Sequence, residues 1–111
     1  MSRPPDLVQG TLDLLLLKII ALEPQHGWAI SQRLRQVSND QLQASDGSVY
    51  PALQKLELAG WIKSEWRTTE LGRRAKFYSL TVPGRKRLAA EVEEWERLSS
   101  AVSRVLRLKE V

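Results

Sequence analysis

Basic side chains gather in one short stretch of this chain, where they could neutralise the phosphates of a nucleic acid. Between Trp61 and Arg87 the local charge is +6, although the whole chain of 111 residues carries only +4. The stretch holds two acidic residues, Glu65 and Glu70, and eight basic ones: Lys63, Arg67, Arg73, Arg74, Lys76, Arg85, Lys86 and Arg87. Binding to a phosphate backbone requires such a concentration of charge, whereas a charged hairpin is more often only a solvated surface. The elements that carry these residues decide between the two interpretations.

A helix with one apolar and one polar face precedes the basic stretch. Helical spacing over residues 46–60 gives the apolar face Val49, Ala52, Leu53, Leu56 and Ala59. The other face carries Ser48, Tyr50, Gln54 and Lys55. We expect this helix to enter the major groove of DNA, with Ser48, Gln54 and Lys55 donating to base edges or phosphates and the Tyr50 hydroxyl meeting the backbone.

After Gly60 the pattern changes to the alternation of a half-buried strand. Residues 62–67 alternate, residues 76–80 return, and Gly72 marks the turn between them. This predicts a β-hairpin, the wing of a winged helix. The residues expected to grip phosphates from it are Lys63, Arg67, Arg73, Arg74 and Lys76. Trp66 and Phe77 are expected to pack the wing against the core.

The first and last predicted helices carry more apolar surface than one small core can cover. The first runs from about Leu7 to Leu22, where Pro24 stops it, and a second spans Gly27 to Val37. The last begins near Gly84, is capped by Thr81, and continues to about Leu106. We therefore predict a homodimer, with an interface formed by Leu12, Leu14, Leu17, Leu88, Val92, Trp95, Leu98, Val102 and Val105.

Two further side chains admit alternatives. Trp95, in the middle of the predicted dimer interface, either packs there or forms the wall of a flat apolar cavity for a small planar effector. His26 stands directly before the second helix, where a histidine caps or packs more often than it binds a metal.

Composition excludes several classes of protein. With no cysteine and one histidine, the chain has no disulfide and no thiolate metal site, and we expect no cofactor. It shows no glycine-rich phosphate loop and no catalytic constellation, so we do not expect an enzyme. The start, with two prolines and an acid in residues 4–6, does not resemble a signal peptide, and the apolar stretch at residues 12–22 is too short to span a membrane. We expect a cytoplasmic, nucleoid-associated protein.

From Leu7 to about Leu106 the chain resembles the PadR family of bacterial transcriptional regulators, in the short subtype with a single C-terminal helix. The resemblance is carried by residues 10–13 (GTLD), 26–28 (HGW), 47–53 (GSVYPAL), 60–62 (GWI) and 73–81 (RRAKFYSLT). The sequence departs from the family pattern at Trp28, where tyrosine is common. It also departs at residues 68–72, which lack the polar, asparagine-rich tip of close relatives.

The resemblance implies a homodimeric repressor that binds a palindromic operator in double-stranded DNA and releases it in response to a signal. It also implies pairing through the first and last helices. In short members that bind planar drugs, a tryptophan of the last helix lines a pore at the dimer centre, and Trp95 is similarly placed.

Together these inferences predict a mostly α protein with a small β-hairpin: a winged helix-turn-helix domain (residues 1–80) followed by a long C-terminal dimerisation helix (residues 81–111). The alternative is a winged helix that serves as a protein-interaction module, with its basic face meeting an acidic partner.

Overall fold

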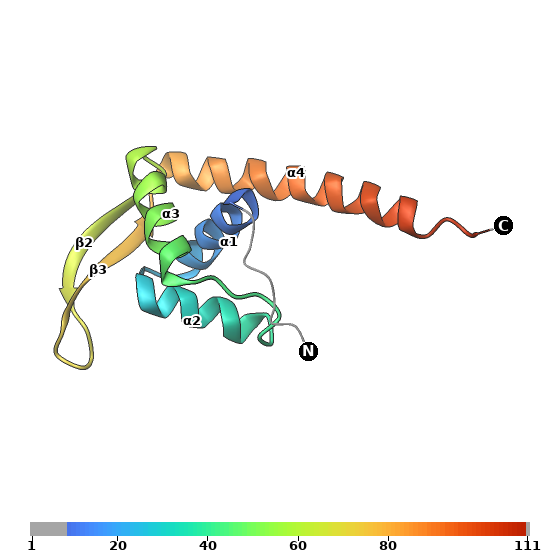
Figure 1. Ribbon diagram of the computed structural model, residues 1–111. Helices are drawn as coiled ribbons and strands as arrows, with labels where there is room; N and C mark the ends of the chain where they lie inside the picture. The colour runs from blue at the N-terminus through green and yellow to red at the C-terminus, as the bar shows by residue number, and fades with distance from the viewer. Residues whose placement is uncertain (1–8, 111) are drawn as a thin grey trace.

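The fold is mostly helical, with a small antiparallel sheet. The computed structural model describes residues 9–110 (Figure 1). In chain order the elements are α1 (Gln9–Leu22), β1 (Gln25–His26), α2 (Gly27–Val37), α3 (Asp46–Leu58), β2 (Ile62–Thr68), β3 (Arg74–Leu80) and α4 (Val82–Leu106). The predicted fold class, a winged helix followed by one long helix, is confirmed. The predicted start of the first helix at Leu7 lies outside the described residues.

The sheet has one strand more than the predicted hairpin. Its strand order is β1-β3-β2, and β1 pairs with β3 through Gln25 opposite Tyr78 and His26 opposite Phe77. Two residues are too few to show the alternation by which a strand is recognised in a sequence. β1 exists because β3 offers it an edge, which is tertiary information.

Helix α1 lies at the centre of the subunit and contacts α2, α3, α4 and β3. Leu12 and Leu17 are 1% and 0% exposed within the single chain. The inference that these two side chains need a partner subunit is therefore wrong, because elements of the same chain surround α1. Leu14 is only partly buried and remains accessible.

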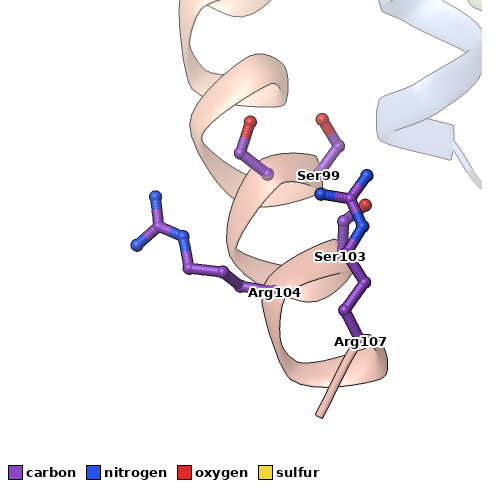
Figure 2. A pocket seen from close by; sticks show the side chains of 5 residues that line it. Ser99, Ser103, Arg104 and Arg107 are labelled. Carbon is purple, nitrogen blue, oxygen red and sulfur yellow. The ribbon is translucent and has the colours of Figure 1, made fainter.

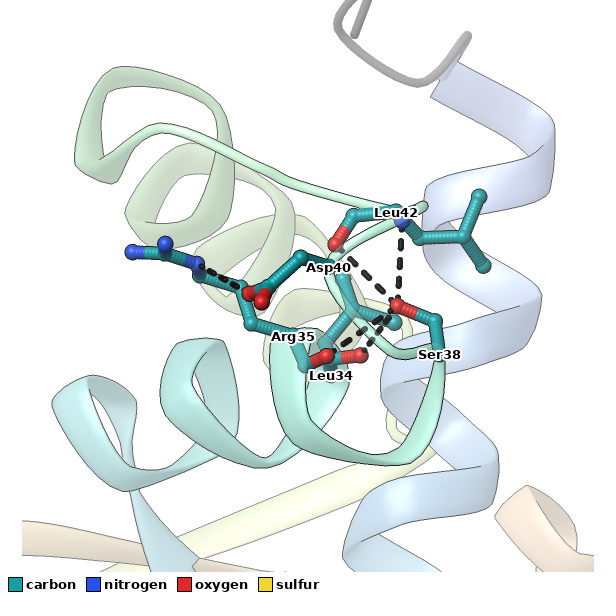
Figure 3. Close-up of polar contacts among 5 residues, drawn as sticks. All are labelled: Leu34, Arg35, Ser38, Asp40 and Leu42. Carbon is teal, nitrogen blue, oxygen red and sulfur yellow. Dashed lines mark hydrogen bonds and ion pairs between the residues drawn. The ribbon is translucent and has the colours of Figure 1, made fainter.

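The turn between α2 and α3 is held by the Ser38 hydroxyl and by an ion pair between Arg35 and Asp40 (Figure 3). Ser38 Oγ donates to the Leu34 carbonyl at 2.8 Å and accepts from the Leu42 amide at 3.0 Å. Asn39 and Asp40 follow with φ of 52° and 62°, a left-handed conformation that asparagine and aspartate tolerate better than most residues. The polar run after Val37 thus ends α2, as the sequence predicts, and directs the chain back toward α3.

Helix α3 begins without a side-chain cap. The residue before the helix is Ser45, whose side chain makes no capping hydrogen bond; its Oγ lies 3.2 Å from Ser48 Oγ instead. Pro51 lies inside the helix rather than in its first turn.

Helix α4 is anchored to the turn between α3 and β2. Thr81 Oγ1 accepts from the Gly84 amide at 3.0 Å, as the predicted cap requires, and donates to the Gly60 carbonyl at 2.6 Å. Gly84 is buried so closely against Trp61 that an added Cβ would lie 1.9 Å from the Trp61 carbonyl oxygen. The Arg87 guanidinium covers the Trp61 ring at 4.6 Å. We call the contact of Thr81 and Gly84 with Gly60 and Trp61 the α4 anchor; beyond it, α4 passes α1, and its C-terminal part extends away from the other elements (Figure 1).

Candidate nucleic-acid interface

Helix α3 has one buried and one accessible face. Val49, Leu53 and Leu56 are completely buried in the core. On the other face, Tyr50 is 46% exposed, Gln54 is exposed, and Ser48 is partly buried. The structure therefore leaves hydrogen-bonding side chains of α3 open to a ligand over the region that the sequence analysis selects.

Tyr50 is positioned by a glycine of another helix. An added Cβ at Gly27, the first residue of α2, would lie 2.5 Å from Tyr50 Cε1. Only glycine therefore lets the Tyr50 ring lie across the start of α2. Sequence patterns do not reveal this contact, because it joins two helices.

Lys55 is engaged within the subunit. Its Nζ forms an ion pair and hydrogen bond with Asp13 Oδ2 on α1, and the Asp13 side chain is only 10% exposed. The lysine side chain remains half exposed, but its ammonium ties α3 to α1. Lys55 therefore helps to hold α3 in place, and its contact with DNA stays a prediction.

The two faces of the hairpin differ in their surroundings. Residues paired directly across β2 and β3 project to the same side. What we call the inner face consists of Ile62, Ser64, Trp66, Thr68, Arg74, Lys76, Tyr78 and Leu80. The outer face consists of Lys63, Glu65, Arg67, Ala75, Phe77 and Ser79. Ser64 Oγ donates to Glu57 Oε2 of α3 at 2.6 Å, so the inner face is the side on which α3 lies.

The inner face continues beyond the core with an aromatic ring and two cations. Trp66 is 58% exposed, and the Arg74 guanidinium lies over its ring at 5.6 Å from the centroid. Lys76 is paired directly opposite Trp66 and is exposed. The expectation that Trp66 packs the wing against the core is therefore wrong, because the hairpin carries it past the helices.

On the outer face, Arg67 is paired within the subunit. Arg67 forms an ion pair with Glu65, and its guanidinium lies 5.3 Å from the Phe77 ring centroid. Phe77 in turn meets the His26 ring edge-on, at a centroid distance of 5.3 Å. His26 also accepts from the Ala29 amide at 3.4 Å and so begins α2. The predicted capping and packing role of His26 is confirmed.

The remaining predicted wing residues lie at the two ends of the hairpin. Lys63 is exposed on the outer face near the base. Arg73 is exposed in the turn, where its amide donates to Thr69 Oγ1 at 3.2 Å, and Gly72 supplies the positive φ of 80°. Of the predicted wing contacts, Arg74 and Lys76 therefore lie on the inner face, the side on which α3 lies, whereas Lys63 and Arg67 lie on the outer face.

Tyr78 lies under this surface. Burial raises the pKa of its hydroxyl above the usual value of 10.0, and the nearby Glu57 carboxylate and Tyr50 add smaller increases. Tyr78 is therefore held neutral between α3 and the wing.

Helix α4 presents an apolar stripe on one side and a polar surface on the other. Trp95 is 47% exposed, and about half or more of the surface of Leu98, Val102 and Val105 is exposed. Nearer the start of the helix, Leu88 packs against the core and Val92 is partly buried. Roughly opposite this stripe by helical spacing lies a shallow hollow of about 300 Å³, lined by Ser99, Ser100, Ser103, Arg104 and Arg107 (Figure 2). The hollow does not involve Trp95.

Over residues 9–110 no cluster of His, Asp or Glu side chains has the arrangement needed to hold a metal ion. In the same part of the chain, no helix combines the length and apolar character that crossing a bilayer demands.

The sequence and the fold of this chain are similar to those of known proteins. Residues 16–90 match the Transcriptional regulator PadR-like family. A transcriptional regulator of Streptococcus superposes with a TM-score of 0.78 at 30% identity, covering 89% of this chain and 95% of that one. A PadR-like transcriptional regulator from Bacillus cereus gives 0.79 at 27% identity, with 91% and 96% covered. A PadR family transcription regulator from Clostridium difficile gives 0.75 at 27% identity, with 86% and 97% covered.

The family match covers more than half of the chain, and these structural neighbours share its fold over nearly their whole length. The family and the neighbours are regulators of transcription rather than enzymes, and the regulators of this family bind DNA. The chain belongs to the PadR-like family of transcriptional regulators.

Proposed function

We propose that this protein is a homodimeric repressor that binds an inverted-repeat operator in duplex DNA, with α3 and the wing of each subunit. One observation carries the proposal: α3, with Tyr50 and Gln54 exposed, lies on the side of the hairpin to which the cations Arg74 and Lys76 project. A duplex that meets one of these surfaces would meet the other.

Helix α3 would enter the major groove. Gln54 can donate and accept in a bidentate contact with adenine, and the Tyr50 and Ser48 hydroxyls can bond to phosphates or base edges. Arg74 and Lys76 would neutralise neighbouring phosphates, with Arg73 contributing from the turn. Lys63 and Arg67 would contribute less, because they lie on the outer face and Arg67 is already paired with Glu65.

The apolar stripe of α4 supports the dimer. It presents Trp95, Leu98, Val102 and Val105 to solvent in a single chain, which an isolated soluble domain rarely does over so long a helix. Two subunits paired through these stripes would address two half-sites separated by about one helical turn or a multiple of it, roughly 34 Å. We place this activity at the nucleoid, in the cytoplasm.

Trp95 is the residue that we propose for a response to a planar apolar effector. Its half-exposed indole is the largest apolar side chain in the stripe, and a second subunit could complete a flat cavity around it. Titration of planar aromatic compounds should change the tryptophan fluorescence of the native protein and not that of Trp95→Ala; equal responses would remove the site.

Selection of tight binders from random duplexes tests the main proposal. A dimeric regulator should enrich an inverted repeat with two equal half-sites. A protein-interaction module with a basic face should enrich no coherent sequence, because its affinity for DNA would be only electrostatic. That second outcome would reject the repressor proposal.

A further inference from the structure

We propose that Trp66 and Arg74 form a single DNA-contacting unit on the wing. In this unit the indole covers the apolar face of a deoxyribose, and the guanidinium that lies over it pairs with the adjoining phosphate. The inference rests on the proposed DNA-binding function and deepens it. It assigns a role to Trp66, which charge and motif patterns leave without one.

The exposure of Trp66 needs an explanation. Tryptophan is usually mostly buried in folded proteins, yet 58% of this side chain is exposed on a hairpin that projects past the helices (Figure 1). Trp66 and Arg74 together line an open depression of about 350 Å³ whose surface is almost entirely apolar. An apolar, cation-edged depression on a protruding element is suited to contact with another molecule rather than to stabilising the fold.

The charges around Trp66 indicate that this molecule is a polyanion. Lys76 stands directly opposite Trp66 in the strand pairing, and Arg74 covers its ring. The inner face of the hairpin carries no acidic residue, and neither cation forms an ion pair with the residues that the structure describes. A nucleic-acid backbone alternates charged phosphates with apolar sugar faces, which a cation beside a ring can contact together.

The same hairpin offers an internal comparison. On the outer face Arg67 also lies over an aromatic ring, that of Phe77, at 5.3 Å. That pair is complete within the subunit, because Arg67 is neutralised by Glu65 and Phe77 packs against His26. Two arginine–aromatic pairs therefore share one hairpin, and only the inner one leaves both its charge and its ring available.

The ring also positions the arginine. A guanidinium that lies over an exposed indole is attracted to the ring, which favours those arginine rotamers that keep the charge beside it. Trp66 would thus act twice, as a contact to the sugar and as the support that keeps Arg74 directed at its phosphate.

A double-mutant cycle on the selected duplex tests the unit. Trp66→Ala and Arg74→Ala should each weaken binding by about tenfold, and the double variant should lose clearly less than the product of the two, because both changes disrupt one contact. Arg74→Ala should reduce the slope of log affinity against log salt by about 1.8 for the dimer, about 0.9 for each of its two wings. Arg67→Ala, which removes the same charge from the same hairpin, should lower both the affinity and the slope less than Arg74→Ala does, because Arg67 lies on the outer face and is paired with Glu65.

A spectroscopic readout separates contact from folding. DNA should quench part of the tryptophan emission of the native protein, and Trp66→Phe should lose that part while it retains the native unfolding midpoint. If the native protein binds its duplex and Trp66→Ala binds equally well, the Trp66 inference is overturned and the regulator proposal stands. If the native protein selects no duplex at all, both fail together.

Discussion

Replacing Gly84 with alanine should loosen the attachment of α4 to the DNA-binding domain. An added Cβ would lie 1.9 Å from the Trp61 carbonyl oxygen and 2.8 Å from its carbon, both atoms of the backbone. Carbon–oxygen contacts need about 3.3 Å, so α4 or the start of β2 would have to move by roughly 1.4 Å. Neither can move alone, because Thr81 bonds to both Gly60 and Gly84.

The expected cost follows from this clash. Overpacking a closely packed site costs typically 1–3 kcal/mol, and the better helix propensity of alanine returns at most about 1 kcal/mol of that. A net loss of about 1 to 2 kcal/mol should lower the melting temperature by roughly 5 to 10 °C for a domain of this size. Thermal and denaturant unfolding followed by circular dichroism would measure it.

Gly10→Ala is the matched control. Gly10 also lies in the first turn of a helix, α1, but an added Cβ there would meet no atom of residues 9–110 within 4 Å. This variant should be as stable as the native protein or slightly more stable. If Gly84→Ala were to unfold within about 0.5 kcal/mol of Gly10→Ala, the contact with Trp61 would not be the close one described here, and the α4 anchor would lose its main support.

Three further predictions address titration, the recognition helix and the dimer. Burial raises the pKa of Tyr78 in the folded state, so its contribution to stability should be complete below the unfolded pKa of about 10 and should disappear as pH rises through the higher folded value. Unfolding free energies measured across this range should fall less steeply for Tyr78→Phe, and equal slopes would contradict the assignment. Lys55→Met should lower the unfolding free energy by about 1 to 2 kcal/mol, because it removes the ion pair with α1, and should leave the salt slope of DNA binding unchanged. Lys76→Met should reduce the salt slope of DNA binding and leave the unfolding free energy unchanged. If instead Lys55→Met reduced the salt slope and Lys76→Met lowered the unfolding free energy, Lys55 would be the phosphate contact. Leu98→Glu should raise the dimer dissociation constant more than about tenfold in sedimentation experiments, whereas Ser100→Glu, on the opposite side of α4, should not; equal effects would place the interface elsewhere.

The long elements could be predicted because their signals are local. The bounds of α2 agree with the prediction, and those of α3 and α4 do so within about two residues, since apolar periodicity, Thr81 and the turn after Val37 are visible in the sequence itself. The accessible face of α3 could be predicted for the same reason. Periodicity also shows which residues of the hairpin share a side, but not which side meets α3.

The remaining features depend on residues far apart in the chain. The Asp13 carboxylate that holds Lys55 comes from another helix, and β1 forms only because β3 is there. The alternation of the strands continues past the point where the core ends. It therefore predicts that Trp66 packs against the core, whereas in the structure this residue is 58% exposed. The surplus of apolar residues in α1 indicated an interface, but the central position of that helix covers Leu17 within the subunit.

The α4 anchor couples the orientation of α4 to that of α3 within each subunit. Helices α4 and α3 are joined through Gly60 and Trp61 without a flexible linker, so neither can rotate without the other. In the proposed dimer, the two α4 helices would cross at the interface. Because each subunit is 62 Å long, a rotation of a few degrees at that crossing would change the distance between the two α3 helices by several ångströms. A signal molecule bound between the two α4 helices would therefore not need to touch the DNA-binding surface. It would change the spacing of the two α3 helices, so that the spacing no longer matches the helical repeat of the duplex.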